Sequence, residues 1–164
     1  MPITLDALLR HMSCAAEEMF KVTGEVSNIW LLENAAGDQT GIHTPICTPP
    51  DMTAGEYKEC LDACLRQAFA ELGVARYAHA HEAWTLVGPS VGNINADHPE
   101  RREAVIIEAS DGDTTLAVMR EIVRPETGKP YLGEESPIGS NSGGRFANML
   151  RPREVLNLER PTLN

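Results

Sequence analysis

The sequence predicts an α+β fold: a mostly antiparallel sheet of about five strands with two main helices packed on one face. Three observations support this class. Residues 5–20 and 53–72 have the apolar spacing of amphipathic helices. Several β-branched and aromatic runs are bounded by Gly, Pro, Asn and Asp, as strands are. These elements follow one another in the order α-β-β-α-β-β-β.

The first helix is expected over residues 5–20, where Leu, Met and Phe recur on one stripe and Thr4 is placed to act as the N-cap. After Gly24, the run EVSNIWLLE predicts a strand over residues 26–32 that leads into a hairpin-like loop at NAAGD. The segment TGIHTPICT predicts its partner strand. Pro45 indicates that this strand is short or at an edge of the sheet.

The second helix has the strongest local signal, the segment TAGE at residues 53–56. It fits a capping box, in which Thr53 and Glu56 each satisfy a backbone N–H of the first turn, and Gly73 ends the helix. We interpret Cys60 and Cys64 as small buried hydrophobes, since their spacing differs from the Cys-x-x-Cys of redox sites. They share an apolar stripe with Tyr57, Leu61, Leu65, Ala68 and Leu72.

Three further strands are expected in VARYAHAHEAWTLV, REAVIIEAS and TTLAVMREIVR, the last two joined by a tight DGD turn. Both faces of the last two strands are apolar, which predicts central positions in the sheet. One domain is therefore expected over residues 1–125. A Pro- and Gly-rich extension, 126–164, is expected to wrap the domain or be partly mobile. Roadblock-like and profilin-like domains have the same element order.

The composition limits the classes of function. The formal net charge is −10, and an acidic surface of this kind disfavours direct nucleic-acid binding. No apolar run approaches the roughly 20 residues that cross a bilayer, and the start MPITLDALLRHMSC lacks the pattern of a secretory signal. A cytoplasmic protein is expected, with Cys14, Cys47, Cys60 and Cys64 as reduced thiols.

The segment RYAHAHEAWTL contains the first candidate site, His79 and His81. Two residues apart on a strand, they face the same side and could both bind one zinc or iron ion. A third ligand would come from His43, Cys47 or His98. The alternative, which so short a motif favours, is a pair of rings on a half-exposed sheet face.

Glu82 and Trp84 point to the other side of the same strand, together with two alanines that leave room for a pocket. A partly desolvated carboxylate beside an indole suits a general acid or base. The alternative, which we favour, is a structural ion pair between Glu82 and Arg102 or Arg120.

Two loops contain the remaining candidates. In DHPERREAV, the residues Asp97, His98, Glu100 and Arg102 are close in sequence. His98 and Arg102 are therefore further candidates for catalysis, although a solvated charged loop is the default interpretation. SNSGGRF at residues 140–146 resembles a small anion-binding loop, but it lacks the established phosphate-loop spacings, which favours a flexible turn.

Three stretches together resemble a family of small bacterial proteins of unknown function, found in bacterial genomes and on mobile elements. They lie mostly within residues 26–125 and read IWLLENAAGD with HTPIC, ARYAHAHEAWTL, and HPERREAVIIEASDGD with REIVR. The recurring pieces are Glu82-Ala83-Trp84 and the lead from Pro99 to Glu103, and the two histidines are not part of the pattern. The resemblance implies a fold and a cellular compartment but no activity.

Three functional hypotheses follow. The first is a non-catalytic cytoplasmic interaction module that binds a protein partner or a second copy of itself, with no cofactor, membrane or nucleic acid. The second is a small metal-dependent or acid–base enzyme that uses Glu82 with His79 and His81. The third is an acidic inhibitor or nucleic-acid mimic from a mobile element, suggested by the net charge and by the resemblance.

Overall fold

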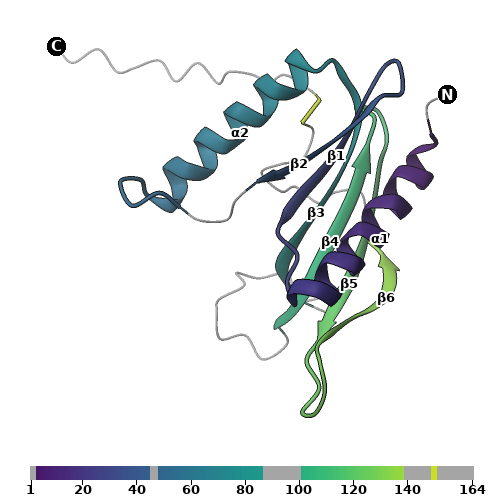
Figure 1. Ribbon diagram of the computed structural model, residues 1–164, viewed down its shortest axis with the longest axis vertical. Coiled ribbons are helices and arrows are strands. Elements are labelled where there is room, and N and C mark those ends of the chain that lie inside the picture. Colours follow the sequence, from purple (N-terminus) through teal and green to yellow (C-terminus); the bar gives the residue numbers. More distant parts are fainter. Residues whose placement is uncertain (1–2, 45–47, 87–100, 139–148, 151–164) are drawn as a thin grey trace.

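The computed structural model describes residues 3–44, 48–86, 101–138 and 149–150, and it confirms the α+β class (Figure 1). Within these residues the elements are α1 (Leu5–Thr23), β1 (Asn28–Asn34), β2 (Gln39–Thr44), α2 (Ala54–Glu71), β3 (Val74–Leu86), β4 (Arg101–Ser110), β5 (Thr115–Val123) and β6 (Tyr131–Pro137). The six strands form one antiparallel sheet in the order β2-β1-β3-β4-β5-β6. β2 is a short edge strand, as Pro45 indicates, and β4 and β5 are both internal, as their apolar faces predict.

The sheet has one strand more than the sequence predicts. β6 lies in the segment assigned to an extension, where Leu132 pairs with Ile122 of β5 and both side chains are buried. Its sequence YLGEESP has no β-branched residue, so its propensity for a strand is weak. Pairing with β5 and the burial of Leu132 stabilise it instead, and neither contribution is visible in the local sequence.

The two helices lie on opposite faces of the sheet, which corrects the expectation of one shared face (Figure 1). α1 packs over Ile29 and Ile107, whereas α2 packs over Trp30 and Tyr77. Successive side chains of a strand point to opposite faces, so the run NIWLL in β1 needs an apolar layer on each side. One helix on each face provides both layers.

α2 is rotated relative to the predicted stripe, and this corrects the interpretation of its cysteines. Cys60 and Cys64 are exposed, whereas the fully buried positions of the helix are Asp62, Leu65 and Phe69. Leu65 and Phe69 are one turn apart and form a second apolar stripe, which overlaps the predicted stripe at Leu65. The stripe that contains the larger side chain, Phe69, is the one that faces the sheet.

Aromatic packing explains why this orientation is preferred. The ring of Phe69 meets Trp30 edge to face, with 5.7 Å between centroids, and lies 5.5 Å from Tyr77. A buried phenyl ring removes far more apolar area from water than a thiol does, and edge-to-face geometry adds to the gain. Asp62 is tolerated on the same face because its carboxylate lies 3.1 Å from the guanidinium of Arg66.

The capping box at the start of α2 is confirmed. Thr53 Oγ1 accepts the Glu56 N–H at 3.2 Å, and the Glu56 carboxylate accepts the Thr53 N–H at 2.8 Å. We expect Thr53→Ala to lower the free energy of unfolding by about 1 kcal/mol, because an N–H of the first turn loses its acceptor. Urea unfolding measures the change. Thr53→Ser keeps the hydroxyl and is the control; an equal loss in both variants would contradict the capping role.

Candidate functional site

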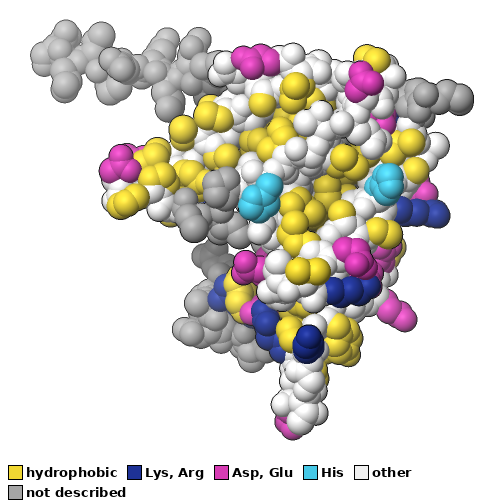
Figure 2. All heavy atoms as spheres, viewed as in Figure 1, with side chains coloured by type: hydrophobic (Ala, Val, Ile, Leu, Met, Phe, Trp, Pro, Cys, Tyr) yellow, Lys and Arg dark blue, Asp and Glu magenta, His cyan; other side chains and the backbone are white. Residues whose placement is uncertain are grey.

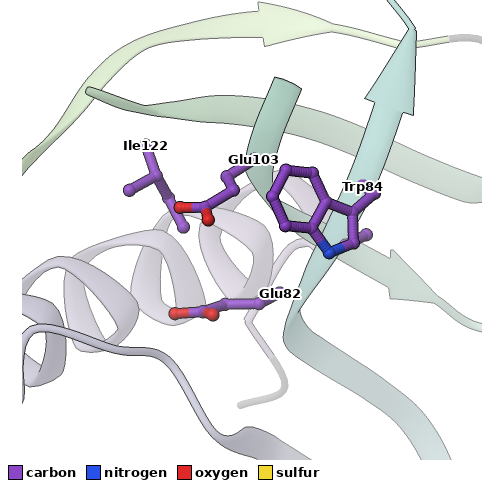
Figure 3. A pocket seen from close by; sticks show the side chains of 5 residues that line it. Glu82, Trp84, Glu103 and Ile122 are labelled. Carbon is purple, nitrogen blue, oxygen red and sulfur yellow. The ribbon is translucent and has the colours of Figure 1, made fainter. Parts of the chain in front are cut away.

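A small cavity lies on the α1 face of the sheet, at the end of β3 (Figure 3). It measures about 90 Å³ and is lined by Glu82, Ala83 and Trp84 of β3, Glu103 of β4 and Ile122 of β5. The 19 residues of α1 extend about 28 Å at 1.5 Å per residue. The 13 residues of β3 extend about 43 Å. The helix is therefore too short to cover the whole strand, and α1 does not extend over the far end of this face.

Strand alternation and register bring the side chains of the cavity together. Glu82 and Trp84 are two residues apart on β3, and Trp84 pairs directly with Glu103 on β4. The three side chains therefore project from the same face of the sheet. Figure 3 shows both carboxylates and the indole lying around the same space.

Trp84 is a large apolar side chain that the described residues do not bury. It is 51% exposed, whereas the other tryptophan, Trp30, is 2% exposed. The guanidinium carbon of Arg101 lies 4.0 Å from the centroid of the Trp84 ring. A cation–π contact of this kind contributes about 0.5–1 kcal/mol at an exposed site, and it holds the indole in place at the mouth of the cavity.

The two carboxylates of the cavity differ in how their charge is balanced. Glu103 Oε2 lies 2.6 Å from the Nε atom of Arg124, which neutralises it. Glu82 Oε1 accepts the backbone N–H of Val26 at 2.7 Å, an interaction with an uncharged group. Among the described residues, no Lys, Arg or His forms an ion pair with Glu82. The cavity therefore has one uncompensated negative charge beside an indole.

The ion pair predicted for Glu82 is therefore wrong in both of its forms. Arg120 Nη1 lies 2.8 Å from a Glu17 carboxylate oxygen on α1, and Arg102 Nη1 lies 3.9 Å from Glu121 Oε1. Glu82 itself is exposed, although its hydrogen bond to Val26 is partly buried. Arg102 is on the strand pair that forms the site but does not line the cavity.

His79 and His81 lie on the opposite face of β3 from Glu82, in a stack of rings. His79 is fully buried and stacks on Trp30, with 3.7 Å between centroids and 10° between planes. His81 continues the stack, 4.6 Å from His79 and inclined by 15°. The half-exposed sheet face expected for this pair is wrong for His79. It is enclosed beside the aromatic rings of Trp30, Phe69 and Tyr77 that pack beneath α2.

Burial keeps both imidazoles uncharged. Loss of hydration lowers the pKa of His81 to about 4. The same cause, reinforced by the neighbouring His81, holds the pKa of His79 well below its ordinary value. Tyr77, on the same face, has its pKa raised to about 12 by burial and by the charge of Glu108. All three rings are therefore neutral at physiological pH.

The two rings of this stack, as they are placed, are not aimed at a common point where a metal ion could lie. The lone pair of an imidazole nitrogen lies in the ring plane, and two planes inclined by only 15° do not meet near the rings. His43, a predicted third ligand, pairs with Ile29 and so faces the α1 side of the sheet. Within the described ranges no three His, Cys, Asp or Glu side chains are grouped to hold a metal. Cys47 and His98 lie outside those ranges.

Several sequence candidates cannot be placed. The loop with Asp97, His98 and Glu100, and the segment SNSGGRF, are outside the described residues. Conversely, Glu103 and Arg124 are absent from the sequence-based site candidates. The signal for Glu103 is its register opposite Trp84, which requires knowledge of how β3 and β4 pair.

No protein-family model, curated protein or solved structure matches this chain. The resemblance to a family of small bacterial proteins therefore stays a prediction. In the part of the chain that the structure describes, no helix is both long and apolar enough to cross a membrane.

Proposed function

We propose that this protein is a non-catalytic interaction module, and that it binds a protein partner by accepting a lysine or arginine side chain between Glu82 and Trp84. The observation that carries the proposal is the uncompensated Glu82 carboxylate beside a half-exposed indole. The carboxylate provides a charge-assisted hydrogen bond to an ammonium or guanidinium group, and the indole provides a surface that attracts cations.

The size of the cavity favours a single side chain over a free substrate. Its volume is about 90 Å³, whereas pockets for small molecules and cofactors measure about 300–1,000 Å³. The aliphatic part of a lysine or arginine can pack on Ile122 and the indole while its charged end reaches Glu82. Exposed tryptophan and arginine are also enriched among the residues that dominate binding energy at protein interfaces.

The distribution of charge supports a basic partner. The chain has a net charge of −10, which attracts a basic surface during the approach. Figure 2 shows acidic side chains spread over the face in view, with Lys and Arg side chains interspersed mainly in its lower half. Near the cavity, Arg101 and Arg124 are engaged by Trp84 and Glu103. These contacts leave the charge of Glu82 available to a partner.

The other two hypotheses have less support from the geometry. An enzyme that joins Glu82 to His79 and His81 needs groups that lie on opposite faces of β3. An acidic inhibitor would bind a basic partner through its total charge, so no single carboxylate would dominate the affinity. That difference makes the inhibitor hypothesis distinguishable from a specific site at Glu82.

The proposal is tested by titrating the full chain with a short Gly/Ser peptide that contains one arginine. The matched peptide contains citrulline, which has the same shape without the charge. We expect a saturable shift of the Trp84 indole N–H signal in NMR spectra with the arginine peptide and none with citrulline. The indole of buried Trp30 is the internal reference and should not move. Equal responses to both peptides would contradict a cation site.

Glu82→Gln is expected to weaken arginine-peptide binding at least tenfold, because a charge-assisted hydrogen bond is worth about 1.5–3 kcal/mol. Glutamine keeps an oxygen that accepts the Val26 N–H, so the fold should be retained. Glu134→Gln removes the same charge from an exposed position on β6 and is the control. Equal losses in the two variants would favour the acidic-inhibitor hypothesis over a site at Glu82.

A further inference from the structure

Cys60 and Cys64 form an exposed pair of thiols on the outer surface of α2. They are one helical turn apart, which places their Cβ atoms about 5–6 Å from each other. The two thiols are close enough for Cys60 to raise the pKa of Cys64. The core contacts of the helix use a different face, that of Leu65 and Phe69. Packing therefore does not explain why two cysteines occupy this spacing.

We propose that Cys60 and Cys64 together bind one soft monovalent metal ion, Cu(I), through both sulfur atoms. The two thiol protons are released as the ion binds, and no electron is transferred. The site is independent of the proposed function, because α2 lies on the opposite face of the sheet from the cavity at Glu82.

The number of ligands favours Cu(I) over zinc. A structural zinc ion is bound by four protein ligands, and a catalytic one by three. In the described residues, no group of three His, Cys, Asp or Glu side chains could hold a metal ion. Thiolates select soft ions such as Cu(I), and Cu(I) accepts two sulfur ligands. A pair of thiols on one helix face thus provides a complete ligand set for this ion.

The spacing favours a bridging ion over a disulfide. A disulfide needs Cβ atoms about 3.5–4.5 Å apart, closer than neighbouring turns of a helix allow. An ion between the two sulfurs adds length to the link, so α2 can remain helical. Both thiols must lose their protons when the ion binds. The affinity is therefore expected to rise with pH.

The experiment uses the full, reduced chain without oxygen, in competition for Cu(I) with the chromophoric chelator bathocuproine disulfonate. We expect one Cu(I) per chain. Cys60→Ser and Cys64→Ser should each weaken binding by at least ~100-fold, since losing a direct ligand costs at least as much as losing a supporting group. Both side chains are exposed, so the helical circular dichroism of these variants should match the unmodified protein.

Two comparisons separate this site from unspecific thiol binding. Cys14→Ser and Cys47→Ser should leave the affinity for Cu(I) unchanged. The double variant Cys64→Ser/Gln67→Cys keeps two thiols on exposed positions of α2 but places them two turns apart. It should bind as weakly as the single variants. Retained affinity in the double variant, loss in Cys14→Ser or Cys47→Ser, or half an ion per chain would each overturn the proposal.

Discussion

Replacing Phe69 by alanine is expected to lower the free energy of unfolding by about 3–5 kcal/mol. The side chain is 3% exposed and contacts the rings of Trp30 and Tyr77. Without the ring, folding buries less apolar area, and a cavity is left between α2 and the sheet. Both effects destabilise the folded protein. The total stability of a domain is about 5–15 kcal/mol, so the loss is a large fraction of it.

Urea unfolding followed by circular dichroism measures this change, with Cys64→Ala as the matched control. Cys64 is on the exposed face of α2, so its replacement should alter stability by no more than about 0.5 kcal/mol. The apolar stripe read from the sequence predicts the reverse, with Cys64 in the core. A larger loss for Cys64→Ala than for Phe69→Ala would therefore contradict the orientation of α2 described above.

The protein is expected to lose stability as the pH falls from about 7 to about 5, with His81 alone accounting for about 2 kcal/mol. The pKa of His81 is about 4 in the folded protein, against an ordinary value of 6.5. Between these values the unfolded chain binds a proton that the folded chain does not, so acid favours unfolding. The contribution is complete above pH 6.5 and is lost as the pH falls toward 4. His79 acts with the same sign.

His81→Phe tests this dependence, because phenylalanine retains a ring for the stack but takes up no proton. The free energy of unfolding, measured at about pH 7 and about pH 5, should fall less in this variant than in the unmodified protein. Carboxylates that titrate in the same range affect both proteins equally and cancel in the difference. His43→Gln, which removes an exposed histidine from another strand, is the control. An unaltered pH dependence in His81→Phe would show that another group is responsible.

Elements whose determinants lie within a few residues are predictable from the sequence of this chain. The capping box needs only Thr53 and Glu56. The DGD turn needs only Asp111, whose Oδ1 accepts the N–H groups of the two residues that follow Gly112. Alternation along one strand likewise separates the histidine pair from Glu82 and Trp84 without any knowledge of the fold. Each of these interactions is made between near neighbours in the chain.

In the candidate site, the features that lie within one strand are predictable from the sequence, and those that depend on two segments are not. Glu82 and Trp84 are recognisable because they belong to one strand, but the partnership of Trp84 with Glu103 depends on register between two strands. The backbone N–H that the Glu82 carboxylate accepts belongs to Val26, which is 56 residues away in sequence. Distances of this kind follow from packing, which periodicity within one element does not specify.

Local sequence thus specifies the order of the elements from α1 to β5, their approximate limits, the acidic charge and the direction of side chains along each strand. The rotation of α2, the placement of the helices on opposite faces and the recruitment of β6 depend on contacts between distant segments. Burying Phe69 against Trp30 outweighs burying two cysteines, and that comparison exists only when the sheet is present. In the described part of the chain, the exposed positions of Trp84 and Glu82 at the end of β3 follow from a helix shorter than the strand that it covers.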